Sequence, residues 1–566
     1  MRGGNPEAPR AGGVLRGAIS GQRRQVVLAS VLAAGHQGGE ALVPVVIGLV
    51  IDSAVATGSA ADLVRWLIVL AAVFAMLSFS YRFGARAAER AAERAAHELR
   101  VRLSERVLDA RGGAETGHLP GALVNIATGD AKRVGGVNGV LPFGIAGLTG
   151  LLVSAIALLR MSVPLGLLVL LGTPPLLYLA HLIGKPLERR SGVEQERAAH
   201  ASGIAADLVS GLRVLKGIGA ESAAVSRYRR TSRDSLAATL RSARAQSWHD
   251  GAILALTGVF IAIVALVGGR LAASGAISVG DLVAAVGLAQ FLIGPFHIFA
   301  YANGELAQGR ASAARIADVL AAEPAVRPGD GELPSSILGR VRLSGVSHGI
   351  LRDVRLEVAP GELVGVVATD PAGATDLLAC LGREADPGSG AVELDGVNLS
   401  TVDPNVVRGA ILVAAHDADL FEGTLLENVS AAANGSNVHR AMAAATADEV
   451  AETLPHGEET RLTERGRSLS GGQRQRVALA RALAANPPVL LVHDPTTAVD
   501  TVTEARIAAE IADLRRDRTT IMVTTSPALL AVTDRVLVLD GGHLTAEGKH
   551  ADLVHDNASY RAAVLS

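Results

Sequence analysis

The sequence has a single cysteine, few aromatic residues and few charges. Cys380 is the only cysteine among 566 residues, which excludes an internal disulfide framework and a cysteine-rich metal site. We expect this lone thiol to be a small buried packing residue. The formal net charge is −2, so no basic excess points to nucleic acid. The residues before Val26 include Arg, Gly and Pro but no apolar core, and we therefore expect no cleaved signal peptide.

Apolar residues, in contrast, are abundant. They make up 49% of the chain, against 19% charged residues. This balance is typical of a membrane protein that also carries a soluble part. Because 566 residues are too many for one core, we expect at least two domains.

Six apolar runs are long enough to cross a bilayer, which takes about 20 residues each. They begin near Val26, Ala61, Val137, Val163, Gly251 and Val279. Arg and Lys crowd the stretches after the second and fourth runs, whereas the stretches after the first, third and fifth runs are short and nearly uncharged. The positive-inside rule then predicts that both termini are cytoplasmic.

The two basic stretches are far longer than a turn between spans requires. Residues 89–107 and 194–209 carry charges that repeat on one side of a helix. We therefore expect a membrane α-helical bundle of six transmembrane helices with long cytoplasmic extensions.

Polar side chains inside the spans are candidates for a substrate cavity, because an ionisable group at membrane depth is costly. The first run holds His36, Gln37 and Glu40, and the sixth holds Gln290 and His297 as weaker candidates. An alternative for Glu40 is a place near the outer interface, or a pairing with a neighbouring helix.

A second domain is predicted after the last span. Residues 323–331 are rich in Pro and Gly, and we place a linker over residues 323–338, after a transmembrane domain at 1–322. Strand-like runs follow at 339–346, 351–358 and 362–368, and helices then alternate with strands to the end. This alternation predicts an α/β domain over residues 339–566.

The most distinctive stretch is LSGGQRQR at residues 469–476. A hydroxyl, two glycines and an amide form a turn whose N–H groups can approach phosphate oxygens, and the helix that follows favours an anion. The stretch resembles the signature motif of ATP-binding-cassette (ABC) proteins, and residues 463–466 resemble the loop that precedes it in exporters. The resemblance implies that Ser470, Gly471, Gly472 and Gln473 contact an ATP held by a partner domain.

The layout of the whole chain resembles the half-transporter of ABC exporters, the type IV fold. The resemblance implies an α/β ABC nucleotide-binding domain behind the helical bundle. It also implies that residues 129–133 and 212–217 are the two coupling helices.

The phosphate-binding loop of this domain departs from its pattern. The strand at 361–367 leads to the loop at 368–376, where the pattern needs glycines, a lysine for phosphate charge and a hydroxyl for magnesium. Gly373 and Thr375 fit, and Thr375 is a weak Mg²⁺ candidate, but Ala374 stands in the lysine position. Asp370 and Asp376 add negative charge where a polyanion would bind.

Other positions that the family uses for ATP hydrolysis are also altered. The strand at 489–492 and the turn after it resemble the Walker B motif and D-loop. His493 occupies the position of the family's magnesium-binding aspartate, and Asp494 occupies that of its catalytic glutamate. His416 occupies the position of the family's Q-loop glutamine, and Thr525 occupies that of its switch histidine. Asp500 of the D-loop is retained.

One alternative treats His493 and Asp494 as half of a metal site or as a catalytic dyad. The remaining ligands are missing at the usual spacing in the sequence, so we do not favour it.

We therefore predict the degenerate subunit of a heterodimeric ABC transporter in a bacterial inner membrane. Its signature motif would complete a site on a second half-transporter with intact Walker motifs. ATP and Mg²⁺ would bind mainly at that shared site, no catalytic residue would lie in this chain's own site, and this subunit alone would be inactive. The cargo would be a small molecule or peptide.

Two alternatives remain open at this point. One is a non-hydrolysing homodimer that acts as a regulatory or scaffold protein, and the other is an importer, for example of a siderophore, built on the exporter fold. The residues reveal neither the substrate nor the direction of transport.

Overall fold

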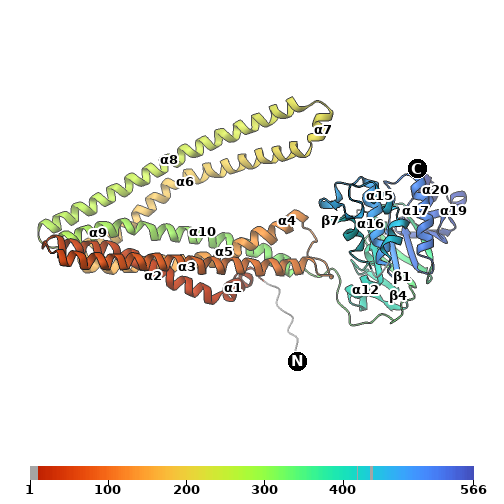
Figure 1. Ribbon diagram of the computed structural model, residues 1–566, viewed down its shortest axis with the longest axis horizontal. Coiled ribbons are helices and arrows are strands. Elements are labelled where there is room, and N and C mark those ends of the chain that lie inside the picture. The colour runs from red at the N-terminus through yellow and green to blue at the C-terminus, as the bar shows by residue number, and fades with distance from the viewer. Residues whose placement is uncertain (1–9, 417–418, 434–436, 566) are drawn as a thin grey trace. The chain divides into compact units, whose positions relative to one another are not determined.

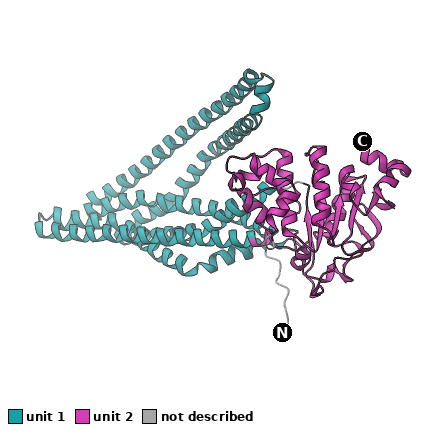
Figure 2. Ribbon diagram, turned by 45° about the vertical axis from the view of Figure 1, so that its right-hand side comes forward, with its two compact units in different colours: residues 1–104, 119–321 teal, residues 105–118, 322–566 magenta. Residues whose placement is uncertain are grey.

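A computed structural model of the chain describes residues 10–565 apart from 417–418 and 434–436. The chain divides into two compact units (Figure 2). The first comprises residues 1–104 and 119–321, and the second comprises residues 105–118 and 322–566.

The first unit is helical. Its helices are α1 (Ala11–Gly21), α2 (Arg23–Val50), α3 (Ala60–Val107), α4 (Pro120–Asn125), α5 (Ala131–Met161), α6 (Val163–Ser210), α7 (Leu212–Gly217), α8 (Glu221–Ala273), α9 (Val279–Phe291) and α10 (Ile293–Ala321) (Figure 1). Two π-helical turns, Ile51–Val55 and Ile126–Asp130, extend α2 and precede α5.

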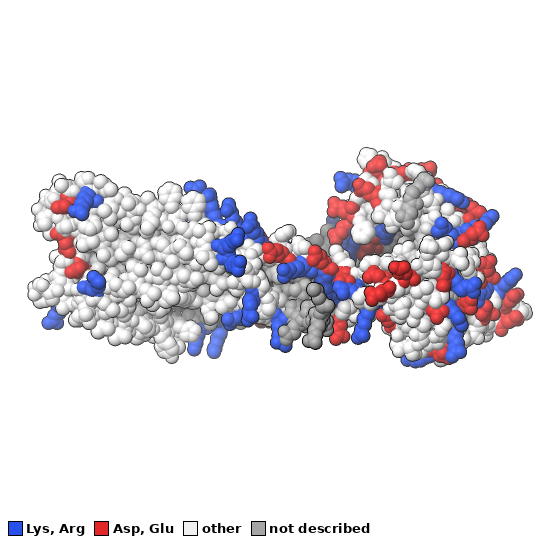
Figure 3. Space-filling view, turned by 90° about the horizontal axis from the view of Figure 1, so that it is seen from below, with Lys and Arg blue, Asp and Glu red and all other residues white. Residues whose placement is uncertain are grey.

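Six stretches of helix within the described residues are long and apolar enough to span a membrane. They are Arg23–Val55, Ala60–Val107, Pro120–Met161, Val163–Ser210, Glu221–Ala273 and Val279–Ala321. This confirms the six predicted spans. Figure 3 shows a broad uncharged belt on this unit, with Lys and Arg gathered on one side of it. The chain is therefore a multi-pass membrane protein.

Small residues let the helices of this unit approach closely. Ala88, Ala92 and Ala96 form a buried stripe on α3, at the four-residue spacing that places side chains on one helical face. A Cβ atom on Gly135 of α5 would lie 2.4 Å from the carbonyl oxygen of Ala92. The contact between α3 and α5 therefore depends on glycine and alanine, as is common between membrane helices.

A buried carboxylate ties the start of α5 to α10. Asp130 is fully buried, and its two oxygens accept hydrogen bonds from Arg315 at 2.6 and 2.7 Å. Ser312 donates a third hydrogen bond at 2.9 Å. The bidentate pairing compensates for the desolvation of the carboxylate.

Helices α6, α7 and α8 form a long hairpin, which we call the α6–α8 hairpin. Its two long helices pack along each other, and their ends near α7 run away from the other helices of the unit (Figures 1 and 2). Val209, Leu212, Val214 and Ile218 are exposed around its tip. An apolar tip with no neighbour among the described residues of this unit is suited to contact with another chain.

Of the two predicted coupling segments, only one is a separate short helix. Residues 212–217 form α7, as predicted. Residues 129–133 instead lie inside a continuous helical stretch, where the π-helical turn passes into α5. The turn at that end of the spans is at residues 108–119, because the helix leading to α5 begins at Pro120.

The second unit is an α/β domain. Its strands are β1 (Val341–His348), β2 (Leu351–Val358), β3 (Leu363–Ala368), β4 (Ser389–Leu394), β5 (Val397–Asn398), β6 (Ile411–Ala414), β7 (Gly423–Thr424), β8 (Arg461–Leu462), β9 (Val489–His493), β10 (Thr519–Val523), β11 (Arg535–Asp540) and β12 (His543–Gly548). Its helices are α11 (Pro371–Leu381), α12 (Pro404–Ala410), α13 (Leu425–Ser430), α14 (Val438–Ala444), α15 (Ala447–Glu452), α16 (Gly471–Ala485), α17 (Thr501–Leu514), α18 (Pro527–Ala531), α19 (His550–Asp556) and α20 (Ala558–Leu565).

Two larger sheets organise this unit. An antiparallel sheet has the order β2-β1-β4-β5, and a six-stranded sheet has the order β12-β11-β3-β10-β9-β6. In the second sheet β11, β3, β10, β9 and β6 are parallel neighbours, so their carboxyl ends meet at one edge. Ligands of open parallel sheets bind at this edge.

Residues 105–118, the end of α3 and nearly all of the turn after it, belong to the second unit. The N–H of Val326 donates to the carbonyl of Arg111 at 3.1 Å, and the guanidinium of Arg106 donates to the carbonyl of Ala322 at 2.8 Å. The beginning of the predicted linker is therefore fixed against the end of α3.

Candidate nucleotide site

The signature turn is the exposed start of α16. The hydroxyl of Ser470 accepts a hydrogen bond from the N–H of Gln473 at 3.3 Å, and the side chain of Gln473 accepts one from the N–H of Ser470 at 2.9 Å. This capping box uses the N–H of Gln473. The N–H groups of Gly471 and Gly472 lie in the first turn of the helix, where no intrahelical carbonyl can accept from them. The turn therefore presents N–H groups and a helix dipole to an anion from outside.

The signature turn packs against the turn between β9 and α17, residues 494–500, which we call the D-loop. A Cβ atom on Gly472 would lie 2.4 Å from the carbonyl oxygen of Ala498, so no side chain fits there. At the far end of the D-loop, Asp500 caps α17 by accepting a hydrogen bond from the N–H of Thr503 at 3.0 Å. That hydrogen bond lowers the pKa of Asp500.

The phosphate loop, residues 368–376, runs from the last residue of β3 into the first half of α11, and its polar side chains are hydrogen-bonded to protein groups. The carboxylate of Asp370 accepts a hydrogen bond from the N–H of Ala372 at 2.8 Å and so caps α11. The next residue, Pro371, has no N–H to offer. An incoming phosphate would therefore meet a carboxylate at the helix start.

The rest of this loop is also tied to protein groups. Ala374 is buried, and the hydroxyl of Thr375 donates to the carbonyl of Pro371 at 3.0 Å. The carboxylate of Asp376 accepts a hydrogen bond from the N–H of Ile350 at 2.7 Å, in the turn between β1 and β2. These residues do not fit a nucleoside triphosphate with its magnesium ion, because the lysine is absent and the loop itself carries two carboxylates.

Cys380 on α11 is buried, as predicted, and burial raises the pKa of its thiol to about 12. The thiol is therefore protonated at neutral pH, and it packs in the core between the two sheets.

Two histidines, His416 and His493, stand where the resemblance to ABC proteins places the Q-loop glutamine and the magnesium aspartate. The rings of His416, after β6, and His493, at the end of β9, lie 5.9 Å apart between centroids. Nδ1 of His416 is 3.4 Å from the carbonyl oxygen of Asp494, and the Asp494 carboxylate is 3.8 Å from Nε2 of His493. Mg²⁺ prefers carboxylate and water oxygens, so this imidazole pair is a poor magnesium site. Among the described residues, no group of three His, Cys, Asp or Glu side chains is arranged to hold a metal.

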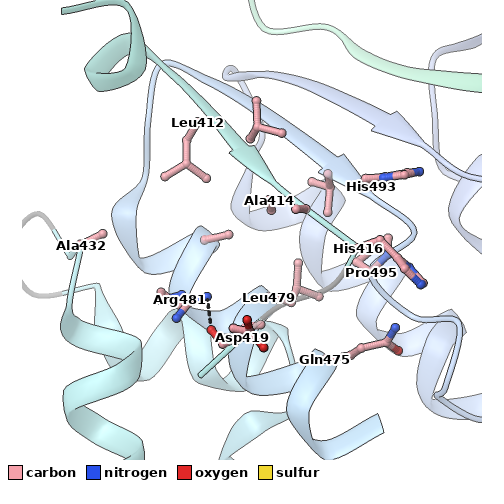
Figure 4. Close-up of a pocket in the computed structure, with 15 residues that line it drawn as sticks. Leu412, Ala414, His416, Asp419, Ala432, Gln475, Leu479, Arg481, His493 and Pro495 are labelled. Atoms are coloured by element: carbon pink, nitrogen blue, oxygen red, sulfur yellow. Dashed lines mark hydrogen bonds between the residues drawn. The ribbon is translucent and has the colours of Figure 1, made fainter. Parts of the chain in front are cut away.

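Both histidines border a pocket of about 350 Å³ (Figure 4). Gln475 and Arg481 of α16 line another side of it, and Arg481 donates to the carbonyl of Asp419 at 3.1 Å. Burial lowers the pKa of the Arg481 guanidinium.

The parallel strands bring the altered positions to one edge of the sheet. The phosphate loop follows β3, His416 follows β6, Asp494 follows β9, and Thr525 follows β10, where its side chain is exposed. The positions that sequence analysis singled out thus converge.

The polar candidates of the first span also come together. Gln37 donates to Glu40 at 3.1 Å, and the ring of His36 lies 5.3 Å between centroids from that of Tyr81 of α3, with the two planes tilted by 47°. His36, Gln37 and Tyr81 line a hollow of about 260 Å³ between α2, α3 and α5, with Ile298 of α10 also on its wall. Gln290 and His297 lie apart from it, with exposed side chains.

Three features of these sites escaped the sequence analysis. They are the contact of His416 with His493, the hydrogen bonds that Asp370 and Asp376 accept from backbone N–H groups, and the place of Tyr81 in the membrane hollow. An aspartate one residue before a proline is a known helix-start signal, so the Asp370 cap was the one that the sequence could have revealed.

Comparison with known families agrees with this architecture. Residues 26–296 match the family described as the ABC transporter transmembrane region, and residues 351–497 match the family described as ABC transporter. The solved structure of a bacterial Atm1-family ABC exporter with ATP bound superposes with a TM-score of 0.73 at 25% identity, over 96% of this chain and 98% of that one.

Curated relatives include a multidrug efflux protein and a lipid flippase. The chain is 32% identical to a multidrug efflux ATP-binding/permease protein of Mycobacterium bovis over 94% of its own length and 45% of the relative. It is 29% identical to an ATP-dependent lipid A-core flippase of Thiobacillus denitrificans over 70% of each chain. The chain thus spans only about half the length of the mycobacterial relative. With six membrane-spanning helices followed by a nucleotide-binding domain, it has the architecture of an ABC exporter half-transporter.

Proposed function

We propose that this chain is the degenerate subunit of a heterodimeric, ATP-driven ABC exporter. It would supply its signature turn to an ATP site whose Walker motifs belong to a second half-transporter. We also propose that it lies in a bacterial inner membrane with both termini in the cytoplasm, and that the cargo passes the hollow beside His36 and Gln37.

The observation that supports this proposal is the contrast between the two halves of the cassette. The signature turn is exposed and capped so that Gly471 and Gly472 can meet an anion. The phosphate loop carries the carboxylates of Asp370 and Asp376 and has no lysine. A domain with these two properties can complete a partner's site but is poorly suited to run its own.

The exposed apolar tip of the α6–α8 hairpin also supports a partner chain. Exposed apolar side chains that lie together on a surface often mark a contact with another protein.

Two substitutions test which half of the cassette works. In the purified heterodimer, Gly471→Arg should abolish steady-state ATP hydrolysis, because a long side chain would fill the space kept for a phosphate. Asp494→Asn should leave hydrolysis within about threefold of the parent. A catalytic residue contributes little when the other residues of the same catalytic site are absent. Asn also tolerates the left-handed backbone at this position, where φ is +42°, so the fold should survive.

The partner for this experiment would be a half-transporter with intact Walker motifs, to be sought first in the neighbouring reading frame. A large loss with Asp494→Asn, or full activity with Gly471→Arg, would show that hydrolysis takes place at this chain's own Walker positions and not at the site completed by its signature turn. Failure of the two chains to co-purify would instead favour a homodimer.

A further inference from the structure

One side chain links the signature turn to the D-loop at two points. Oε1 of Gln475 accepts a hydrogen bond from the N–H of Ala498 at 2.8 Å, and its Nε2 donates to the hydroxyl of Thr497 at 2.7 Å. A backbone N–H can only donate, so the amide of Gln475 must be oriented in this way.

The segment held by Gln475 is otherwise exposed. Thr497 and Ala498 have exposed side chains, whereas both flanks of the D-loop are anchored elsewhere. On one flank Thr496 donates to Glu504 at 2.6 Å, and on the other Asp500 caps α17. The two contacts from Gln475 therefore fix the tip of a turn whose ends are already attached.

The same contacts fix the position of the D-loop tip relative to the signature turn at the start of α16. Ser470 and Gly471 begin α16, and Gln475 lies just over one turn further along it. Gly472 adds a close backbone contact to Ala498, so the start of α16 and the tip of the D-loop form one continuous surface. A partner that engages the signature turn must meet the D-loop tip as well.

We propose that Gln475 is a positioning residue for ATP hydrolysis at the shared site. This inference rests on the proposed function. Gln475 holds the D-loop tip at the place where it meets the partner while the signature turn meets the partner's nucleotide. The side chain itself is committed to Thr497 and Ala498, so it does not contribute to nucleotide affinity.

The test separates turnover from binding in the purified heterodimer. Gln475→Ala should lower kcat for ATP hydrolysis by about tenfold, the order expected when two hydrogen bonds are lost. KM for ATP and the Kd of a fluorescent ATP analogue should stay within about twofold of the parent. Gln475→Glu keeps an acceptor for Ala498 and should retain most of the activity.

Thr497 provides the matched control. Thr497→Ser keeps the hydroxyl and should behave as the parent, whereas Thr497→Val should lower kcat by about threefold. On the Gln475→Ala background Thr497→Val should cause no further loss, because the shared contact is already gone.

A second measurement does not depend on activity. Hydrogen exchange of the peptide that contains Ala498 should accelerate in the Gln475→Ala chain, while the peptide that contains β10 should exchange as in the parent. Unchanged exchange at Ala498, or a kcat within twofold of the parent, would overturn the role of Gln475. So would a fall in kcat that comes with weaker nucleotide binding and a lower Tm, since that is the result of general structural damage.

The failure of this inference can be distinguished from that of the proposed function. If Gly471→Arg abolishes hydrolysis but Gln475→Ala does not slow it, only the role of Gln475 is wrong. If Gly471→Arg is active, or no heterodimer forms, the proposed function fails and the role of Gln475 fails with it.

Discussion

Asp370 accepts a hydrogen bond from a backbone N–H within the phosphate loop, and Asp376 of the same loop accepts one from Ile350 in the turn between β1 and β2. Their distances of 2.8 and 2.7 Å are those of strong hydrogen bonds to charged acceptors. The lack of a lysine at position 374 is therefore only one of the ways in which this loop differs from a phosphate-binding loop. A phosphate would have to displace one carboxylate and approach another, at a cost in electrostatic energy.

This arrangement predicts how the isolated chain binds ATP. Affinity should be about two or more decades weaker than for an intact cassette, since the lysine and the magnesium ligand are both lost. Ala374→Lys alone should tighten binding by less than about threefold, because the new ammonium would pair with the neighbouring carboxylates. The combination Asp370→Gly, Ala374→Lys and Asp376→Thr should tighten it by at least about tenfold.

Titration with a fluorescent ATP analogue measures these affinities. Glycine is tolerated at a helix start, so Asp370→Gly should cost only a few tenths of a kcal/mol in stability. The double variant Asp370→Gly, Asp376→Thr, without the lysine, serves as the control. Micromolar affinity of the parent chain with no partner present would contradict this account.

Some of the residue-scale features could be predicted from the sequence, and others could not. The positions of Ala374, His493 and Thr525 follow from the spacing of short motifs, which depends on neighbours along the chain. The contact between His416 and His493 depends on β6 and β9 being adjacent, and the Asp376 contact depends on the turn between β1 and β2. Local pattern carries no information about such pairings.

At the scale of elements, the tie between Asp130 and α10 should be important for stability. Arg315→Ala leaves a fully buried carboxylate with Ser312 as its remaining close donor, and removing one partner of such a pair is costly. Because the Arg315 side chain is itself 46% exposed, we expect a loss of about 2 kcal/mol rather than the larger values of fully buried pairs.

Thermal unfolding in detergent measures this loss. Arg133→Ala is the matched control, since its guanidinium lies 3.7 Å from the same carboxylate and its side chain is exposed. That variant should change stability by less than about 0.5 kcal/mol. Equal effects of the two substitutions would mean that Arg315 does not hold α10 to the start of α5.

The error in the predicted coupling segment has the same origin. Hydropathy sets the start of the third span near Val137, whereas the helical stretch begins at Pro120. The resemblance then places a coupling helix at residues 129–133, before that start. The partners that tie Asp130 into the helical bundle, Ser312 and Arg315, are about 180 positions away in the sequence. The six spans themselves were predictable, since length and apolar content are properties of each segment alone.

At the scale of the whole molecule, the α6–α8 hairpin should be protected by a partner. In the purified chain, trypsin should cut quickly after Arg213 and Lys216 in α7, because this short helix has no buried residue. In the heterodimer the same cuts should be at least about tenfold slower, as expected if local opening becomes less favourable by at least 1.4 kcal/mol.

Mass spectrometry of the fragments over time gives these rates. The control is the same chain in the same detergent with an unrelated membrane protein at equal concentration. Equal rates of cutting in the isolated chain and in the heterodimer would mean that the partner does not cover the hairpin tip.

The buried thiol has a practical consequence for the study of motion. Because Cys380 is the only cysteine and its thiol is shielded and protonated, it should not react with maleimide or methanethiosulfonate reagents in the folded protein. A cysteine introduced on the hairpin tip or beside the signature turn would then be the only site to accept a spin label or fluorophore. Distances within the working transporter are therefore accessible to spectroscopy without first removing a native residue from the core.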